Sequence, residues 1–282
     1  MTIALIGAAG QLGTELPSSL SGDVALLTHG EIELTDASSV ESKLAAIRPR
    51  LVINAAAYNL VDRAEEEPEL AYAVNALGPR NLARFCAAGD VALLHVSTDF
   101  VFGLESPRDR PYSEDDVPGP LSAYATSKLA GEHFVRALCR RHYVVRTCGL
   151  YGPNPRHGNF VETMLRLAKD GRKLRVVDDQ RCTPTSARDL AQAICRLVET
   201  EAYGLYHAAN SGETTWYGFA AEIFRRRGVD ADLAPITSAE YGAPARRPAY
   251  SVLDCSKLRK ATGFEFQPWQ NALADYLQRR DA

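Results

Sequence analysis

Hydrophobic positions in the first half of the chain form short apolar runs, separated by longer stretches with helical periodicity. The runs are nearly continuous, which is typical of strands that are buried on both faces. The stretches between them space apolar residues three or four positions apart, as amphipathic helices do. Predicted strands cover 3–6, 24–28, 51–54, 91–96 and 143–146, and predicted helices cover 11–20, 37–47, 70–88 and 121–141. This alternation predicts an α/β fold in which a doubly wound parallel sheet carries helices on both faces.

The alternation weakens after about residue 150. Loops rich in Gly, Pro and Arg follow at 152–158, 178–185 and 242–248. A further helix, predicted over 186–200, carries an apolar stripe that suits it to cover the main sheet. We therefore expect one domain over 1–150 and a smaller region over 151–282, of which about 183–207 returns to the main sheet.

Composition and charge narrow the class of protein. The 282 residues are 46% hydrophobic and 24% charged, which is ordinary for a globular chain with a sizeable core. A net charge of -3 is not that of a nucleic-acid-binding protein, and no apolar run approaches the ~18 residues of a membrane span. The N-terminus lacks the pattern of a signal peptide. We expect a cytoplasmic protein without nucleic-acid or membrane partners.

The cysteines point to no metal site. They form no C-x-x-C motif and have no closely spaced histidines, which disfavours zinc binding. Several fall in apolar segments, so we expect reduced, mostly buried thiols. The six are Cys86, Cys139, Cys148, Cys182, Cys195 and Cys255.

A glycine-rich turn follows the first predicted strand. Gly7, Gly10 and Gly13 stand between this strand and the first predicted helix. Glycines in this position let the backbone approach a pyrophosphate, whereas elsewhere such a turn is often only structural. The order of strand, turn and helix therefore predicts a dinucleotide-binding, Rossmann-like domain over 1–150.

A tyrosine and a lysine lie one helical turn apart downstream. Tyr124 and Lys128 share one face of the predicted helix over 121–141. An unperturbed phenol, with a pKa near ~10, is a poor acid–base group at neutral pH, and a neighbouring ammonium favours the phenolate. Tyr-x-x-x-Lys pairs are common on solvated helix surfaces. Downstream of a glycine-rich turn, this pair indicates proton transfer beside a bound dinucleotide.

Together these motifs resemble the dTDP-4-dehydrorhamnose reductase family of extended short-chain dehydrogenase/reductases. The G-x-x-G-x-x-G spacing is similar to the extended type, and further similar phrases cover essentially the whole chain. They are Asn54-Ala55-Ala56-Ala57, Ser97-Thr98-Asp99, 64–69, 74–76, 179–185, 211–216 and 247–254. The resemblance implies reduction of the C4 keto group of dTDP-4-dehydro-6-deoxy-L-mannose (dTDP-4-dehydrorhamnose) to dTDP-L-rhamnose. The implied cofactor is NADPH or NADH, and the implied partner is a small-molecule nucleotide sugar.

The resemblance also implies roles for single residues. Thr98 would bind the substrate oxygen, Tyr124 would donate the proton, and Lys128 would lower the tyrosine pKa and hold the ribose. With these last two, the implied cofactor-binding residues are Gly7, Gly10, Gln11, Leu12, Gly13, Asp36, Asn54, Ala55, Ala56 and Tyr58. Implied substrate-binding residues are Thr98, Asp99, Asn159 and Arg247. Arg246 or Arg247 would contact the pyrophosphate, and a solvated surface position is the alternative for both.

Two positions depart from the family pattern, and a third matches it without its expected partners. Gly149 stands where an aromatic residue is expected to contact the sugar. We therefore expect the protein to enclose the sugar ring less tightly and to discriminate weakly between stereoisomers of the 4-keto-6-deoxyhexose. The residues after the second strand lack an arginine for a ribose 2′-phosphate, and Glu31 is the nearest carboxylate. We therefore expect use of both cofactors, with at most a modest preference for NADPH. Glu15 matches a family position for Mg²⁺ at a dimer interface, but its partners do not clearly align, so the resemblance leaves Mg²⁺ unsupported and we assign no metal site.

Two other functions fit the same residues. One is a 4-ketoreductase for another nucleotide-linked deoxysugar. The other is a cofactor-binding regulatory subunit without turnover, because the family includes a homologue that modulates methionine adenosyltransferase. Intact Thr98, Tyr124 and Lys128 favour catalysis. The sequence leaves the oligomeric state open, with a homodimer as one expectation.

Overall fold

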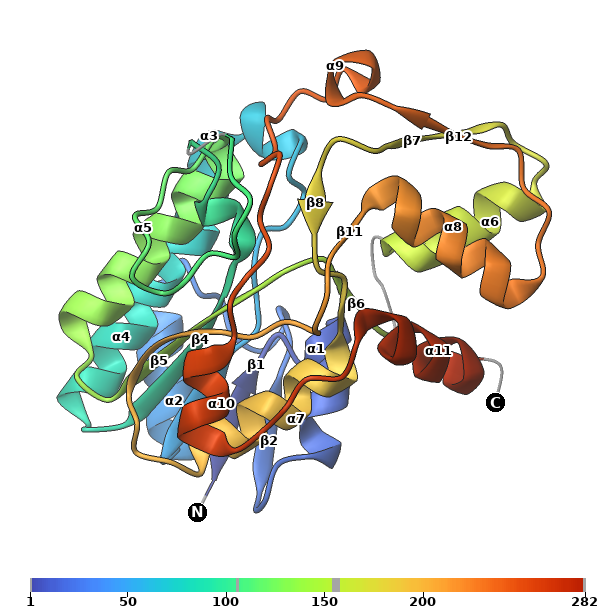
Figure 1. Ribbon diagram of the computed structural model, residues 1–282. Helices are drawn as coiled ribbons and strands as arrows, with labels where there is room; N and C mark the ends of the chain where they lie inside the picture. Colours follow the sequence, from blue (N-terminus) through green and yellow to red (C-terminus); the bar gives the residue numbers. More distant parts are fainter. Residues whose placement is uncertain (1, 105–106, 154–157, 281–282) are drawn as a thin grey trace.

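The centre of the molecule is a parallel sheet of six strands in the order β10-β5-β4-β3-β1-β2 (Figure 1). The computed structural model describes residues 2–104, 107–153 and 158–280. The strands are β1 (Ile3–Ile6), β2 (Val24–Leu27), β3 (Leu51–Asn54), β4 (Ala92–Thr98), β5 (His142–Thr147) and β10 (Gly204–His207). Every neighbouring pair runs parallel. The strand order reverses between β1 and β3, where open α/β sheets form a ligand crevice at their carboxyl ends.

Helices cover both faces of this sheet, as the apolar pattern predicts. On one face, α2 (Ala37–Ile47), α4 (Gly78–Ala88) and α5 (Ala123–Leu138) bury one set of strand side chains. On the other face lie α1 (Gln11–Glu15), α7 (Ala187–Val198) and α10 (Ser256–Thr262). The predicted α/β class with a doubly wound parallel sheet is confirmed.

Two predicted helices differ in detail. The helix expected over 11–20 ends at Glu15 and continues as a 3-10 turn (Leu16–Ser18), because Pro17 cannot supply the N–H of a continuing α-helix. The helix expected over 70–88 consists of α3 (Pro68–Tyr72), a π-helical segment (Ala73–Leu77) and α4.

The π-helical segment fixes the position of α5. A Cβ on Gly131 of α5 would lie 2.2 Å from the carbonyl oxygen of Asn75, so only glycine allows this approach. The Asn75 side chain donates a hydrogen bond to Ser127 Oγ at 3.0 Å and another to the Tyr58 carbonyl oxygen at 2.9 Å. α5, which carries Tyr124 and Lys128, is thereby held against the preceding helices.

A second core forms beside the sheet and contains α6 (Phe160–Lys169), α8 (Trp216–Arg227) and α11 (Trp269–Arg280). Short strand pairs surround it: β7 (Leu174–Val177) with β12 (Leu233–Ile236), β8 (Arg181–Cys182) with β11 (Thr214–Thr215), and β6 (Leu150–Tyr151) with β9 (Thr185–Ser186). Short helical turns are Arg63–Glu65, Asp99–Val101 and α9 (Ser238–Tyr241). The domain division at residue 150 stays a prediction. α7 packs on the main sheet and β10 is one of its strands, and both lie within the segment 183–207 that was expected to return to it.

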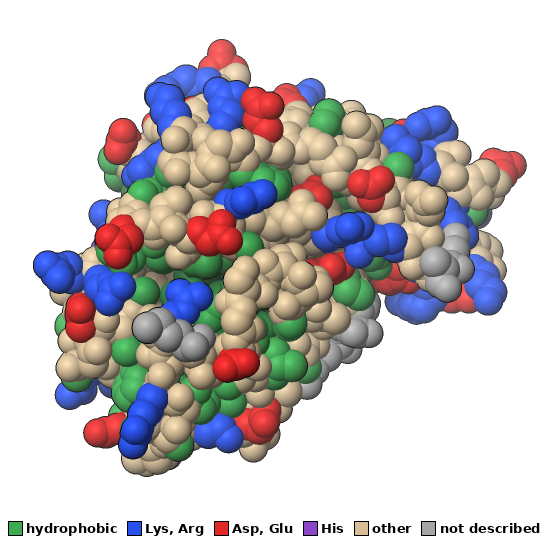
Figure 2. Space-filling model, turned by 90° about the horizontal axis from the view of Figure 1, so that it is seen from below, with side chains coloured by type: hydrophobic (Ala, Val, Ile, Leu, Met, Phe, Trp, Pro, Cys, Tyr) green, Lys and Arg blue, Asp and Glu red, His purple; other side chains and the backbone are tan. Residues whose placement is uncertain are grey.

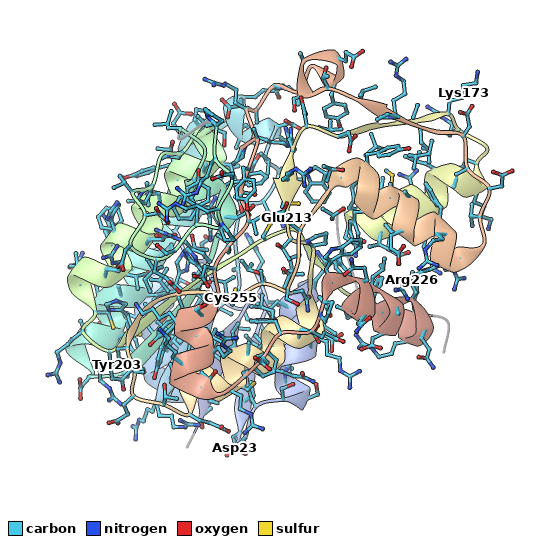
Figure 3. All side chains as sticks on the ribbon, in the orientation of Figure 1. Asp23, Lys173, Tyr203, Glu213, Arg226 and Cys255 are labelled. Carbon is cyan, nitrogen blue, oxygen red and sulfur yellow. The ribbon has the colours of Figure 1, made fainter. Side chains whose placement is uncertain are left out.

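Glu213 joins the parts of the molecule that meet near β11. Figure 3 places it between the sheet and the side that carries α8. Its carboxylate accepts hydrogen bonds from Arg181 Nη1 and from the Tyr250 hydroxyl, both at 3.0 Å. The C-terminal segment around Tyr250 is therefore tied to the loop that precedes α8.

Charged side chains of both signs are interspersed on the face seen in Figure 2. This face carries no single-sign field of the kind that attracts a polyanion. Among the described residues, no helix combines the length and the apolar character needed to cross a bilayer.

Candidate active site

The glycine turn leaves β1 in a conformation that requires glycine. Gly7 has φ +81°, and a Cβ there would lie 2.7 Å from the Ala56 nitrogen. A Cβ on Gly13 would lie 2.2 Å from the Gly7 carbonyl oxygen. The Gly10 N–H donates to that same oxygen at 2.9 Å. The missing side chains leave backbone exposed at the carboxyl edge of the sheet, which is the cradle that a dinucleotide pyrophosphate needs.

A cavity of about 300 Å³ opens beside this turn. Six residues predicted to bind the cofactor line it: Gly7, Gly10, Gln11, Leu12, Ala55 and Ala56. Thr28 and His29, in the stretch after the second strand that was expected near the ribose, also line it, whereas sequence analysis missed Ile32, Glu33, Leu34 and Val96. They lie in the loop after β2 and at the end of β4, and their contribution depends on chain folding that no local motif encodes.

Three other residues predicted to bind the cofactor are not among those that line the cavity, and they form hydrogen bonds within the protein. They are Asn54, Tyr58 and Asp36. Buried Asn54 lies 3.1 Å from His95 Nδ1 and accepts a hydrogen bond from the Ala56 N–H at 3.1 Å, so it shapes the turn after β3. The Tyr58 hydroxyl donates to Glu67 at 2.9 Å. Exposed Asp36 caps α2 by accepting from the Ser38 N–H at 2.9 Å. Their contact with the cofactor stays a prediction.

Gln11 connects the glycine turn to the second core. Its Oε1 accepts hydrogen bonds from the Gly152 N–H at 2.8 Å and from Asn159 Nδ2 at 2.9 Å. Asn159 also caps α6, with its Oδ1 accepting from the Glu162 N–H at 2.9 Å. The amide of Asn159 is thus committed to joining α6 to the turn, and its role as a substrate ligand stays a prediction.

Thr98 and Tyr124 come together where β4 ends and α5 begins. The Thr98 side chain lies close enough to the Tyr124 hydroxyl to oppose the rise in its pKa. The Tyr124 ring stands edge-on to Phe100, with centroids 6.1 Å apart. Burial of the phenol raises the pKa of Tyr124 to about 12, with a smaller contribution from the nearby Asp99 carboxylate. At neutral pH the phenol is therefore protonated and able to donate.

Lys128 follows Tyr124 by one turn of α5 and is only 2% exposed. Its Nζ donates a hydrogen bond to the Val96 carbonyl oxygen at 2.7 Å. Burial lowers the pKa of Lys128 to about 8, against the opposing effect of the Glu132 carboxylate. The net pKa of Tyr124 is raised in this structure, and the expected lowering of that pKa by Lys128 stays a prediction. The ammonium is directed at a backbone carbonyl, and burial dominates at the phenol.

A buried ion pair holds this part of α5 in place. Glu132 follows Lys128 by one turn and is fully buried. Its carboxylate accepts from Arg146 Nε at 2.9 Å, from Arg146 Nη2 at 2.7 Å and from Ser97 Oγ at 2.6 Å. These bonds join α5 to both β4 and β5. Sequence analysis missed this pair, although an arginine within the apolar strand 143–146 was a usable signal.

Asp99 is buried immediately after Thr98. Ser251 Oγ donates to its carboxylate at 2.5 Å, and Thr98 Oγ1 lies 3.2 Å from it. Burial raises the pKa of Asp99 to about 6, against the effect of these hydrogen bonds and of the Cys148 thiol. The carboxylate therefore anchors the segment around Ser251 over the end of β4, and a direct contact with substrate stays a prediction.

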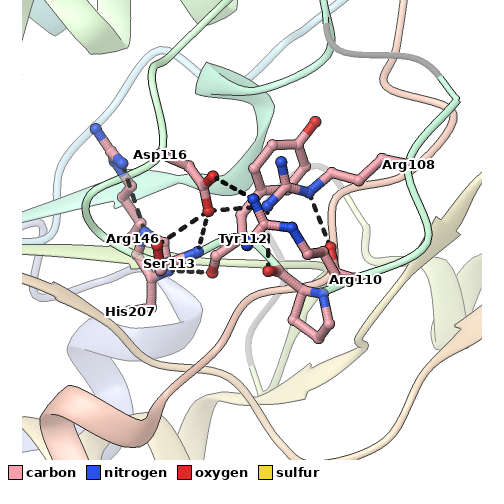
Figure 4. Close-up of polar contacts among 8 residues, drawn as sticks. Arg108, Arg110, Tyr112, Ser113, Asp116, Arg146 and His207 are labelled. Carbon is pink, nitrogen blue, oxygen red and sulfur yellow. Dashed lines mark hydrogen bonds and ion pairs between the residues drawn. The ribbon is translucent and has the colours of Figure 1, made fainter.

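The loop that follows Asp99 is packed around a buried arginine (Figure 4). The Arg108 side chain is 2% exposed and donates to Asp116 at 2.8 Å. Its guanidinium carbon lies 3.7 Å from the ring centre of Tyr112, which stacks on Phe102 with centroids 4.0 Å apart. The Tyr112 carbonyl oxygen lies 2.9 Å from Nδ1 of His207 on β10. The loop beside Thr98 is thereby anchored to β10, an edge strand of the sheet.

Arg247, expected at the pyrophosphate or on the solvated surface, forms an ion pair instead. Its two terminal nitrogens donate to Asp62, each at 2.9 Å. The Ala245 N–H also donates to Asp62 at 3.2 Å, and the guanidinium holds the pKa of this carboxyl below its usual range. This pair joins the loop over 242–248 to the segment after β3. A contact between Arg247 and the substrate stays a prediction.

Comparison with known proteins places this geometry in a family. Residues 1–281 match the family model described as the RmlD substrate binding domain. The chain belongs to this family. A relative from Streptomyces griseus, named dTDP-4-dehydrorhamnose reductase, is 44% identical over 280 residues, which are 95% of this chain and 90% of that protein.

Solved structures of this family show the same fold. The crystal structure of a dTDP-4-dehydrorhamnose reductase from Clostridium acetobutylicum has a TM-score of 0.95 at 39% identity and covers 100% of each chain. A dTDP-4-dehydrorhamnose reductase from Bacillus anthracis, solved in complex with NADP, has a TM-score of 0.94 at 36% identity and covers 99% of each chain. The family resemblance read from the sequence is confirmed.

Gly149, where the family resemblance predicts an aromatic residue, does not leave open space. It has φ +52°, and a Cβ there would lie 3.2 Å from Pro184 Cα and 3.5 Å from Trp216 Cη2. Trp216 begins α8 and packs against Phe160 with ring centroids 4.9 Å apart. The Trp216 ring and the backbone of Pro184 occupy the space beside Gly149, and the enclosure of the sugar stays a prediction. Sequence analysis missed Trp216.

Glu15 does not stand among metal ligands in the described part of the chain. Its carboxylate accepts from Arg279 Nη1 at 3.0 Å. No group of three or more His, Cys, Asp or Glu residues within 2–104, 107–153 and 158–280 is arranged to hold a metal ion. A guanidinium partner disfavours a cation at this carboxylate.

Proposed function

We infer that this chain is an NAD(P)H-dependent oxidoreductase. We infer that it reduces the C4 keto group of dTDP-4-dehydrorhamnose to give dTDP-L-rhamnose. Family membership and the names of its full-length relatives support this reaction. The observation that carries it is the meeting of Thr98, Tyr124 and Lys128 at the edge of the sheet that holds the glycine cradle.

In this proposal the chain binds and orients the cofactor and the sugar nucleotide, and it protonates the sugar oxygen. A reduced nicotinamide held by the glycine turn would supply a hydride to the sugar carbonyl carbon. Thr98 Oγ1 donates a hydrogen bond to the carbonyl oxygen, and the Tyr124 hydroxyl transfers its proton to that oxygen as the new C–H bond forms. The raised pKa of Tyr124, at about 12, keeps the phenol protonated before the reaction, as reduction requires. The buried ammonium of Lys128 stabilises the phenolate that remains.

The test is a turnover assay. The purified protein is mixed with dTDP-4-dehydrorhamnose and either NADPH or NADH, while the nicotinamide absorbance is followed and the sugar product is identified by NMR. We expect cofactor oxidation that depends on the sugar nucleotide, with dTDP-L-rhamnose as product. Cofactor binding without turnover would support the regulatory alternative instead. Turnover of a different 4-keto sugar nucleotide alone would show that the protein is a 4-ketoreductase for that other sugar.

Two further expectations belong to this proposal. We propose that the protein acts in the cytoplasm, where nucleotide sugars are made, and that it forms a homodimer. Light scattering on the eluting protein measures the mass directly, and a mass near 30.8 kDa would contradict the dimer.

A further inference from the structure

A second cavity opens beside the helices of the second core. Its volume is about 1210 Å³, and its lining comes from α6, from the ends of α8 and α11, and from the last residue of α1. The three helices of the second core lie near one another in the fold (Figure 1). Among the described residues, only Gly158 lines both this cavity and the one beside the glycine turn. The second cavity is therefore a separate space, which the proposed reduction does not use.

The lining of this cavity is positively charged. Five cationic side chains and two anionic ones leave an excess of three positive charges in the described lining. All five cations belong to the last turns of α6, α8 and α11. A hollow lined mainly by one sign of charge raises the local concentration of the opposite ion. The cations are Arg166, Lys169, Arg227, Arg279 and Arg280, and the anions are Glu15 and Glu162.

Both carboxylates in the lining are paired with arginines. Arg279 Nη1 donates to Glu15 at 3.0 Å, and Arg280 Nε donates to Glu162 at 2.8 Å. The Tyr276 hydroxyl also donates to Glu162, at 2.8 Å. These bonds join the end of α11 to α1 and to α6, so the walls of the cavity are held in place by the protein itself.

Arg166 and Lys169 differ from these arginines, because neither forms an ion pair with a described residue. The partial negative charge at helix C-termini accounts for basic residues in a last turn. It does not account for three last turns whose cations line one cavity. A phosphate-bearing anion does, since guanidinium and ammonium groups donate charge-assisted hydrogen bonds to phosphate oxygens. Leu165 and Val229 add apolar lining against which the rest of a nucleotide can pack.

We propose that this cavity is a second ligand site, which binds an anion through its pyrophosphate group. Free pyrophosphate and a nucleoside diphosphate share this group. A volume of this size admits either, since pockets for small molecules typically measure ~300–1,000 Å³. Arg166 and Lys169 hold the phosphates. The site goes beyond the proposed reduction, because neither side chain lies among the residues around the glycine turn or Tyr124.

The test measures binding of inorganic pyrophosphate by isothermal titration calorimetry, with saturating NADPH present to occupy the glycine turn. We expect binding that weakens as salt is added. Arg166→Gln combined with Lys169→Gln should weaken it by at least ~10-fold, because two charge-assisted hydrogen bonds are lost. The matched control combines Arg136→Gln with Lys260→Gln. It removes one arginine and one lysine from exposed last turns of α5 and α10, outside the cavity, and should leave the affinity unchanged.

A charge-preserving variant separates loss of the site from loss of the fold. Arg166→Lys combined with Lys169→Arg keeps both charges and should restore most of the affinity. Absence of pyrophosphate binding to the protein with NADPH present would overturn the proposal. Equal affinity in the natural protein and in the Gln double variant would overturn it as well.

A second titration, with dTDP, distinguishes the two sources of the pyrophosphate group. Only the binding that the Gln double variant loses is assigned to this cavity, because dTDP also resembles the proposed substrate. Cavity binding of dTDP that is tighter than that of pyrophosphate would identify a nucleoside diphosphate as the ligand. Weaker or absent cavity binding of dTDP would identify free pyrophosphate. Failure of the proposed reduction would leave these binding results unaffected, since no turnover is measured.

Discussion

Tyr124→Phe removes one oxygen atom from the proposed proton donor and leaves its packing intact. The phenylalanine ring keeps the edge-on contact with Phe100, which has an interplanar angle of 89°. What disappears is the hydroxyl beside Thr98, which the raised pKa keeps protonated at neutral pH. The substitution therefore separates proton donation from the shape of the site.

The expected loss of rate follows from this geometry. General acid catalysis is typically worth ~10²–10⁴-fold, which corresponds to about 2.7–5.4 kcal/mol of transition-state stabilisation. Cofactor affinity should change by less than ~3-fold, because the glycine turn and the cavity are untouched and at most one neutral hydrogen bond is lost.

The assay compares kcat/KM for the sugar nucleotide with the dissociation constant for the cofactor, measured on the same preparation. Tyr72→Phe, a matched change on a tyrosine of α3 that is 40% exposed, serves as the control and should leave both unchanged. If Tyr124→Phe keeps more than about a tenth of the natural kcat/KM, Tyr124 is not the proton donor.

Three further predictions concern Lys128, Glu132 and Gly149. The rate should fall as pH rises through about 8, because the pKa of Lys128 is lowered to about 8 and its protonated form is the active one. A pH profile that is flat to pH 9.5 would contradict this prediction. A Lys128→Met variant with the natural rate and cofactor affinity would contradict it as well. Glu132→Gln should lower the free energy of unfolding, measured by urea titration, by about 3–5 kcal/mol, because it leaves the buried Arg146 guanidinium uncompensated. Glu199→Gln serves as the control. It changes an ion pair that is more than half exposed and should lower the free energy of unfolding by less than about 1 kcal/mol. Gly149→Ala should destabilise the protein by about 1–3 kcal/mol, because it places a Cβ 3.2 Å from Pro184 Cα at φ +52°; an unchanged melting temperature would show that the backbone relaxes at no cost.

Features encoded locally could be read from the sequence. Apolar runs predict each main strand through residue 146, because strands buried on both faces need continuous hydrophobic side chains. The glycine turn could also be placed from the sequence, because glycines are required where a Cβ would collide with backbone, as at Gly7 and Gly13. The four-residue spacing of Tyr124 and Lys128 puts both on one helix face.

Contacts between distant segments could not be read in this way. The pairing of Arg247 with Asp62 joins residues 185 positions apart, and no local pattern indicates it. Trp216 reaches Gly149 only after α8 packs beside the end of the sheet. The direction of the tyrosine pKa shift also depends on the fold, because burial outweighs the effect of a lysine that faces a carbonyl oxygen.

The most direct test of the central claim is transfer of deuterium from the cofactor to the sugar. The protein is incubated with dTDP-4-dehydrorhamnose and nicotinamide cofactor that carries deuterium at C4 in a single stereochemical configuration, using each configuration in turn. We predict that one configuration yields dTDP-L-rhamnose with one deuterium at C4 of the sugar, and that the other yields unlabelled product. Absence of deuterium at C4 from both configurations, or absence of the rhamnose product, would contradict the account.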